Sequence, residues 1–224
     1  MKKWTRANYL PAVPLGLDGR RITAGPEHIN LSKEAAKEGM GMLKNYNRVL
    51  PLHNGERIAL FGKGTIDYVK GGGGSGDVTV PYIRNLYEGL CQVIDPATIF
   101  PDTVEFYRKD VEAQYAAGRA PGMTVEPELP DALVRKAAVF TDTAIVSFSR
   151  FSGENWDRKA AFDPQKEHKN ASMELVNTLG EIFEDGDFYL SHAERAMLEK
   201  VCAAFNRIIV VLNTGAVGET ASLQ

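Results

Sequence analysis

Residues 208–212 have the sequence IIVVL, a fully apolar run that ends at Asn213-Thr214-Gly215. A short, continuous apolar run bounded by turn residues is typical of a strand that is buried on both faces of a sheet. Residues 57–61 (RIALF, followed by Gly62) and residues 143–148 (TAIVSF) show the same pattern. The sequence therefore predicts three buried strands.

Segments with helical periodicity lie between these runs. We expect helices from Ser32 to about residue 43, over residues 82–94, 110–117 and 132–137, and from the capping-box residue Ser191 to about residue 205, with a further strand over residues 104–107. Strands that alternate with helices predict an α/β fold, in which a mostly parallel sheet carries helices on both faces. We place this α/β-sandwich domain at residues 31–217, between an irregular N-terminal arm at residues 1–30 and a polar tail at residues 218–224.

The composition argues against two classes of partner. The 224 residues carry 26 Lys and Arg against 29 Asp and Glu, a net charge of −3, whereas a nucleic-acid-binding surface usually needs a basic excess. No run reaches the ~18 apolar residues of a membrane span. Pro11 and Pro14 interrupt the start of the chain, which does not fit the signal-peptide pattern. We therefore expect a cytoplasmic protein with neither nucleic acid nor membrane as its partner.

The cysteines and histidines give no sign of a metal site. Cys91 and Cys202 each lie in an apolar helical pattern, which predicts two reduced thiols in the core. The four histidines are scattered, and none has the spacing of a metal ligand relative to another His, Cys or carboxylate. We expect no metal and no cofactor.

The loops that follow the predicted strands are the best place for a functional site. In parallel sheets, ligands bind beyond the carboxyl ends of the strands. The three strands lead into residues 62–76, residues 149–154 and residues 213–215. If the sheet is parallel, all three loops lie on one rim.

The first of these loops contains the glycine-rich sequence KGGGGSG at residues 70–76. It lacks the Gly-Lys-Ser/Thr ending of a P-loop and the G-x-G-x-x-G pattern of a dinucleotide site, so a nucleotide-binding loop is weakly supported. A flexible linker is a second interpretation, although the loop falls within one predicted strand–helix unit. The third interpretation, which we favour, is a loop whose backbone closely approaches another ligand.

Glu154 is the ionisable residue of greatest interest, because it stands in a short polar loop directly after a predicted strand. Phe151 and Trp156 would supply apolar surroundings that raise the pKa of a general acid, whereas Arg150 and Arg158 would lower it. The other interpretation is an exposed carboxylate that pairs with Arg158.

These segments together resemble glycoside hydrolase family 3, the β-glucosidase-like enzymes, and specifically their α/β-sandwich domain. The resemblance covers roughly residues 28–217. It rests on the helical sequence of residues 34–45 with the following VLPL, on IALFG at 58–62 with the glycine loop and Asp77-Val78, on Ser152-Gly153-Glu154 with Asp157-Arg158, and on residues 209–215.

The resemblance implies a retaining mechanism with two carboxylates. Glu154 would be the general acid/base, and Gly73, Gly74, Ser75 and Phe151 would border the subsite of the leaving group. The nucleophile would come from a (β/α)8 barrel domain supplied from elsewhere, because a chain of 224 residues has no room for a barrel of ~250 residues beside this domain. We find no stretch that resembles the nucleophile motif.

The resemblance therefore predicts a component of a glycosidase that acts on β-linked glucosides and is inactive as an isolated chain. It also implies a sheet that is incomplete at its C-terminal end, whose open edge could pair with a second copy. Two alternatives remain open at this point: a non-catalytic module that binds sugars or acts as a scaffold, and a nucleotide-binding protein that uses the glycine loop.

Overall fold

The computed structural model describes residues 15–20, 22, 24–71, 78, 80, 82–153, 158, 160–161, 180–216 and 218–223. The chain divides into two compact units, residues 1–48 and residues 49–224.

The first unit contains helix α1 (Pro26–Glu38) and the 3-10 turn η1 (Tyr46–Arg48). The prediction that this helix begins at Ser32 was wrong, because Ser32 lies in its middle. Proline is favoured at the first position of a helix, where its fixed φ suits the helix and its missing N–H costs nothing. Pro26 occupies that position after Gly25, and no side chain of α1 is buried.

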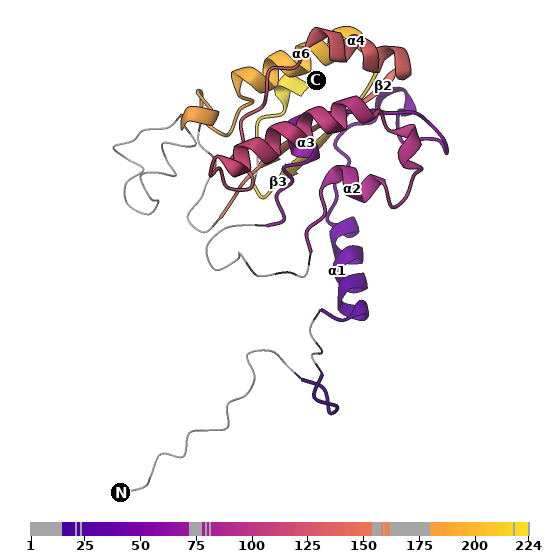
Figure 1. Cartoon of the computed structure of the whole chain (residues 1–224), viewed down its shortest axis with the longest axis vertical. Helices are drawn as coiled ribbons and strands as arrows, with labels where there is room; N and C mark the ends of the chain where they lie inside the picture. The colour runs from indigo at the N-terminus through magenta and orange to yellow at the C-terminus, as the bar shows by residue number, and fades with distance from the viewer. Residues whose placement is uncertain are drawn as a thin grey trace, which may run out of the picture. The chain divides into compact units, whose positions relative to one another are not determined.

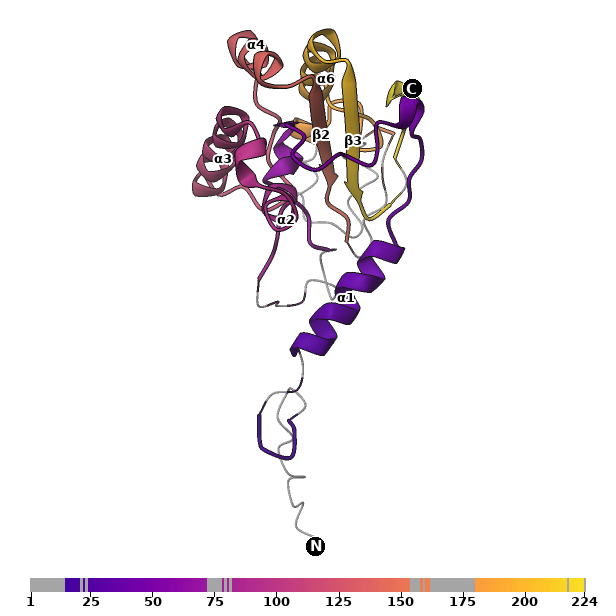
Figure 2. The same cartoon turned by 90° about the vertical axis from the view of Figure 1, so that its right-hand side faces the viewer.

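The second unit is built on a parallel sheet of three strands, β1 (Ala59–Phe61), β2 (Thr143–Arg150) and β3 (Arg207–Thr214), in the order β1-β2-β3. All three predicted strands are confirmed. The register places Ala59 opposite Ala144, and Ala144 opposite Ile208. Within the described part of the chain, β3 pairs with β2 on one side only, so the sheet is not closed. Figure 2 shows β2 and β3 side by side.

Helices cover both faces of this sheet. They are α2 (Leu86–Leu90), α3 (Pro101–Ala116), α4 (Asp131–Phe140) and α6 (His192–Ala204). On one face, Phe61 and Val146 pack with Val134 of α4 and with Met197 of α6. Figure 1 shows α4 and α6 next to each other in this layer. The opposite sheet face packs against α2 and part of α3, in a cluster formed by Ile58, Leu60, Ile145, Val104, Leu86 and Leu90. The predicted α/β class is confirmed.

Helix α3 corrects one strand prediction. Residues 104–107, which we expected to be extended, lie inside one continuous helix that also contains the predicted short helix over residues 110–117. Val104, Tyr107 and Val111 are its buried side chains, at the spacing of three and four residues that marks one helical face. A four-residue apolar run cannot by itself distinguish a strand from this face.

Other local predictions had mixed outcomes. The helix expected over residues 82–94 shortens to α2, where Asn85 and Glu88 form a capping box. The capping box at Ser191 is confirmed, since its side-chain oxygen accepts a hydrogen bond from the Glu194 N–H. Both cysteines are free, as predicted, and half-buried Cys91 packs against the cluster around Ile58. The prediction of a core position was wrong for Cys202, which is exposed because the neighbouring Val201 takes the buried side of α6.

No helix in the described ranges is both long and apolar enough to cross a membrane. In the same ranges, no three His, Cys, Asp or Glu side chains lie close enough to hold a metal ion.

Candidate functional site

A cleft of about 210 Å³ opens beyond the carboxyl ends of the strands. Its described walls come from the three loops that the sequence placed on one rim. They are Val69, Lys70 and Gly71 after β1, the last residue of β2 (Arg150) with Ser152 of the segment that follows it (called the β2 loop), and the last two residues of β3 (Asn213 and Thr214) with Gly215. The cleft is smaller than the ~300–1,000 Å³ of pockets that enclose drug-sized ligands.

Close backbone packing brings the loop after β1 onto β2. Gly62 has φ of +88°, and a Cβ at this residue would overlap the carbonyl oxygen of Ser147. A Cβ at Gly64 would lie 2.7 Å from the same oxygen. Only glycine therefore allows the chain to turn from β1 into the cleft along this path.

Asn213 fixes the next part of this loop to the end of β3. Its side-chain oxygen accepts a hydrogen bond of 2.9 Å from the Val69 N–H. Gly215 approaches the β2 loop so closely that a Cβ there would overlap the Ser152 hydroxyl. The three segments therefore converge as predicted, because hydrogen bonds and glycine contacts join each one to its neighbour.

Beneath the cleft, Asp67 is the centre of a buried polar cluster that sequence reasoning missed. Its carboxylate accepts hydrogen bonds from the Tyr115 hydroxyl (2.6 Å), the Gly122 N–H (2.6 Å) and the Thr124 hydroxyl (2.5 Å). The Nζ of Lys63, only 1% exposed, lies 4.0 Å from the same carboxylate and also donates to the Thr124 carbonyl. The Lys63–Asp67 spacing of four residues was the only sequence signal.

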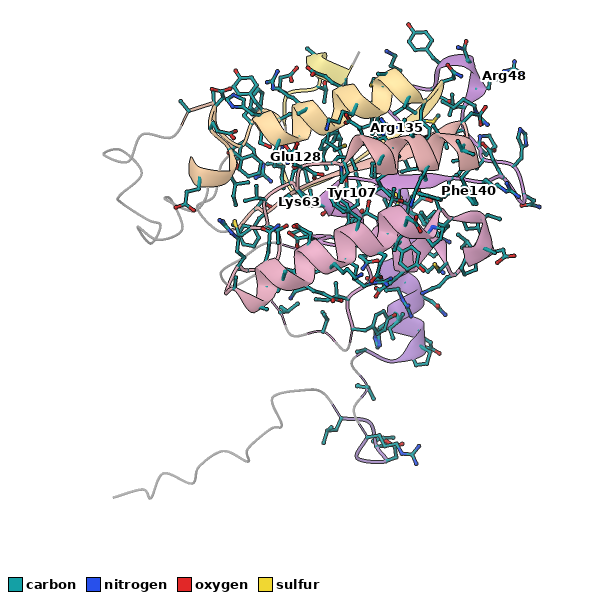
Figure 3. The ribbon with its side chains drawn as sticks, turned by 45° about the horizontal axis from the view of Figure 1, so that its top comes forward. Arg48, Lys63, Tyr107, Glu128, Arg135 and Phe140 are labelled. Atoms are coloured by element: carbon teal, nitrogen blue, oxygen red, sulfur yellow. The ribbon has the colours of Figure 1, made fainter. Side chains whose placement is uncertain are left out.

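Glu126 completes this cluster. Its carboxyl group accepts a hydrogen bond of 2.8 Å from the Lys63 N–H, and burial raises its pKa to about 8. Burial also raises the pKa of Tyr107, which α3 carries into the core, and lowers that of the Lys63 amine (both side chains are labelled in Figure 3). Burial therefore favours the uncharged forms of both Glu126 and Lys63.

Two buried arginines flank the segment that contains Glu154. Arg150 makes a two-pronged ion pair with Glu194 of α6, with N–O distances of 2.6 and 2.7 Å, and its guanidinium lies 4.3 Å from the centre of the Phe183 ring. Arg158 pairs with Asp187 at 2.7 Å. From the sequence we considered both arginines as charges acting on Glu154; the structure shows that each has a buried carboxylate of its own.

The predicted site residues fall partly outside the described residues. Phe151 is described: it is half-buried and packs against the cluster of Met123, Ile182 and Phe183, at the base of the β2 loop. Glu154 and the glycine-loop residues Gly73, Gly74 and Ser75 lie outside the described residues. The segments that lead into both groups, Lys70–Gly71 and Ser152, meet at the cleft.

The sequence and the fold of this chain are both similar to those of known proteins. The family model described as the glycosyl hydrolase family 3 C-terminal domain matches residues 40–223. The chain belongs to this family. The match covers all three strands and all three loops of the cleft, so the site described above is a site of a family 3 C-terminal domain.

Two curated relatives of this family 3 domain are β-glucosidases. Beta-glucosidase A of Butyrivibrio fibrisolvens is 54% identical over 220 residues, which is 98% of this chain and 26% of that protein. The Beta-glucosidase of Ruminococcus albus is 30% identical over 196 residues, which is 84% of this chain and 18% of that protein. The chain therefore spans about a quarter or less of the length of these relatives.

Solved β-glucosidase structures share the fold of this family 3 domain. Beta-glucosidase 3B from Thermotoga neapolitana, in complex with glycerol, superposes with a TM-score of 0.68 at 28% identity, over 88% of this chain and 25% of that one. The β-glucosidase from Paenibacillus barengoltzii superposes with a TM-score of 0.66 at 27% identity, over 85% of this chain and 19% of that one.

Proposed function

We propose that this family 3 domain supplies the general acid/base of a retaining β-glucosidase, and that Glu154 is that group. The observation that carries the proposal is the position of the β2 loop. Arg150 at the end of β2 and Ser152 in this loop line the cleft, and Glu154 follows two residues after Ser152. The relatives' names support a β-linked glucoside as the substrate.

The proposed mechanism uses two carboxyl groups about 5–5.5 Å apart. Protonated Glu154 donates its proton to the glycosidic oxygen while the nucleophilic carboxylate attacks the anomeric carbon. Glu154, now ionised, then removes a proton from the water that hydrolyses the glycosyl-enzyme intermediate. The nucleophile belongs to a (β/α)8 barrel that this chain does not supply.

The cleft is the proposed subsite for the leaving group. The glycine loop, through Gly73, Gly74 and Ser75, forms one side of the subsite, and Phe151 supports the other side. Two features support this arrangement: Gly71 lines the cleft, and Phe151 is anchored in the cluster around Met123. The terminal sugar would be held mainly by the barrel.

The variant Glu154→Gln tests the proposal, in the chain combined with a nucleophile-bearing barrel domain. We expect kcat/KM to fall by about 100- to 10,000-fold for an alkyl β-glucoside. The loss should be much smaller for 2,4-dinitrophenyl β-glucoside, because its leaving group needs no proton. Exposed Glu128 (labelled in Figure 3) provides the matched control Glu128→Gln, which should leave both rates unchanged. An unchanged rate in Glu154→Gln would favour the non-catalytic sugar-binding or scaffold module.

A further inference from the structure

Arg158 stands four residues after Glu154, and its side chain is clamped at three acceptors. One guanidinium nitrogen donates to the Phe151 carbonyl at 2.5 Å and to the Asp187 carboxylate at 2.7 Å. The other terminal nitrogen donates to the Thr214 hydroxyl at 3.4 Å. The Arg158 and Asp187 side chains are only 4% and 1% exposed, so this ion pair is shielded from water.

The hydrogen bond from Arg158 to Phe151 joins the two ends of the segment 151–158. Phe151 and Arg158 are the two ends of the segment that contains Glu154, and the Arg158 side chain joins them directly. The same guanidinium ties the segment to Asp187 in the stretch before α6 and to the end of β3.

Arg150, which precedes Phe151, is also held by residues 187–194. Arg150 donates to the carbonyl groups of Asp187 and Tyr189 and to the Glu194 carboxylate. Both arginines therefore fasten the base of the β2 loop to residues 187–194.

The buried Arg158–Asp187 pair with its hydrogen bonds, which we call the clamp, is not explained by a gain in the free energy of unfolding. Removing two charges from water costs about as much as their attraction returns, and well-packed apolar residues of similar size often stabilise a fold equally well. What the forked guanidinium does provide is directional geometry, because its donors fix the relative positions of the groups that accept from them.

We propose that Arg158 and Asp187 are positioning residues, whose buried ion pair holds together the two ends of the segment that carries Glu154, the proposed acid/base. The inference rests on the proposed function of Glu154. Neither residue touches the substrate; the pair acts by fixing both ends of the segment that carries the acid/base.

The first experiment uses the chain alone. It compares Arg158→Lys and the double variant Arg158→Met/Asp187→Leu with the wild type. The double variant removes both charges of the pair together, so neither is left buried without the other, and it is expected to fold. We expect amide hydrogen exchange to become at least tenfold faster in residues 151–158 of both variants, and to stay unchanged in β1 and β2. Unchanged exchange in residues 151–158 would overturn the clamp.

A matched control sits at the opposite end of the strands. Glu56 pairs with Arg207 there and also accepts from the Thr143 hydroxyl. Glu56→Gln removes an Arg–carboxylate pair that does not contact the β2 loop, so it should lower the thermal midpoint without changing exchange in residues 151–158. A change there in this control would show that general destabilisation, and not the clamp, controls the loop.

The second experiment measures catalysis by the same variants combined with a barrel domain. A displacement of a catalytic group by about 1 Å costs on the order of 100-fold in rate. We therefore expect the double variant to lose about 100-fold in kcat/KM on an alkyl β-glucoside and far less on 2,4-dinitrophenyl β-glucoside, with KM little changed. The same fractional loss on both substrates would overturn the positioning role.

Glu154→Gln, assayed in parallel, separates the two ideas. If the loss in kcat/KM depends on the leaving group in Glu154→Gln but not in the double variant, the inference about the clamp is wrong and the proposed function stands. If Glu154→Gln shows no such dependence, the proposed function is wrong and the positioning role is wrong with it.

Discussion

At the scale of single residues, burial changes the pKa values of ionisable side chains in this domain. Lys63, Asp67 and Glu126 are all buried. Burial lowers the pKa of the Lys63 amine and raises the pKa of Glu126 to about 8, because burial disfavours the charged form of each group.

Glu126 makes the stability of the domain depend on pH. Its folded-state pKa of about 8 lies above the ordinary 4.5. Between pH 4.5 and 8 the unfolded chain ionises this group and the folded chain does not, so the free energy of unfolding falls as the pH rises, by about 1.4 kcal/mol per unit. Glu126→Gln cannot ionise. We expect it to match the wild type near pH 4 and to be several kcal/mol more stable at pH 8, as measured by urea unfolding. Equal stability of the two proteins at pH 8 would refute the assignment.

Gly62 is a second residue whose type is imposed by its surroundings. Its φ of +88° and its contact with the Ser147 carbonyl leave no room for a side chain. We expect Gly62→Ala to cost at least about 2 kcal/mol in the free energy of unfolding. The control is Gly89→Ala in α2, where no atom lies within 4 Å of the added methyl group; it should gain about 0.5–1 kcal/mol. Thermal denaturation of both variants checks this, and a harmless Gly62→Ala would contradict it.

At the scale of elements, Glu194 links the start of α6 to the end of β2. Glu194 lies in the first turn of α6, where its carboxylate accepts from the Ser191 N–H at 2.9 Å and from both terminal nitrogens of Arg150. The helix N-terminus favours a negative charge at this place. The capping box therefore also fixes the position of α6 against the end of β2.

Breaking this junction should be costly. We expect Glu194→Gln to lower the free energy of unfolding by about 3–5 kcal/mol, because Arg150 is left charged and buried. For a domain of this size the thermal midpoint should fall by roughly 10 °C. Glu105→Gln, which breaks an exposed pair with Arg108 on α3, should change stability by less than about 1 kcal/mol. Similar losses in both variants, measured by calorimetry, would count against the junction.

At the scale of the whole molecule, the proposed function makes this chain one side of an active site that is shared with another domain. It spans 26% of Beta-glucosidase A and 18% of the Ruminococcus albus β-glucosidase. A retaining mechanism needs a nucleophile and an acid/base together. The proposed division places Glu154 here and the nucleophile on another domain.

The isolated chain should therefore fail to hydrolyse 4-nitrophenyl β-glucoside above the buffer background. The measurement requires a sample whose intact mass has been confirmed, with the Glu154→Gln variant run beside it. Turnover that disappears in Glu154→Gln would mean that this chain holds a nucleophile of its own.

The open sheet leads to a prediction about assembly. Within the described residues β3 has a strand neighbour on one side only, and Leu212 on this strand is 36% exposed. Unpaired strand edges tend to pair with another chain, and charged residues prevent it. We expect light scattering to show dimers of the isolated chain at high concentration, and fewer dimers for Leu212→Lys. A monomer at every concentration would exclude pairing through this edge.

Local sequence patterns predicted the three strands of the sheet and the start of α6. The strands around residues 59–61, 143–150 and 207–214 and the capping box at Ser191 follow from contiguous residues, because apolar runs, capping residues and turn residues act on their immediate neighbours. The convergence of three loops on one rim then followed from the parallel order of the strands. The failures, such as residues 104–107, came where a short apolar run suits both a helix and a strand.

The sequence by itself thus determined the strands, the class of fold and the rim on which the site lies. Only the tertiary structure decided the electrostatics of that site. Arg150 meets Glu194 across 44 residues, and Arg158 meets Asp187 across 29. Charges separated so far along the chain leave no local pattern, since their attraction becomes strong only when folding removes water from between them.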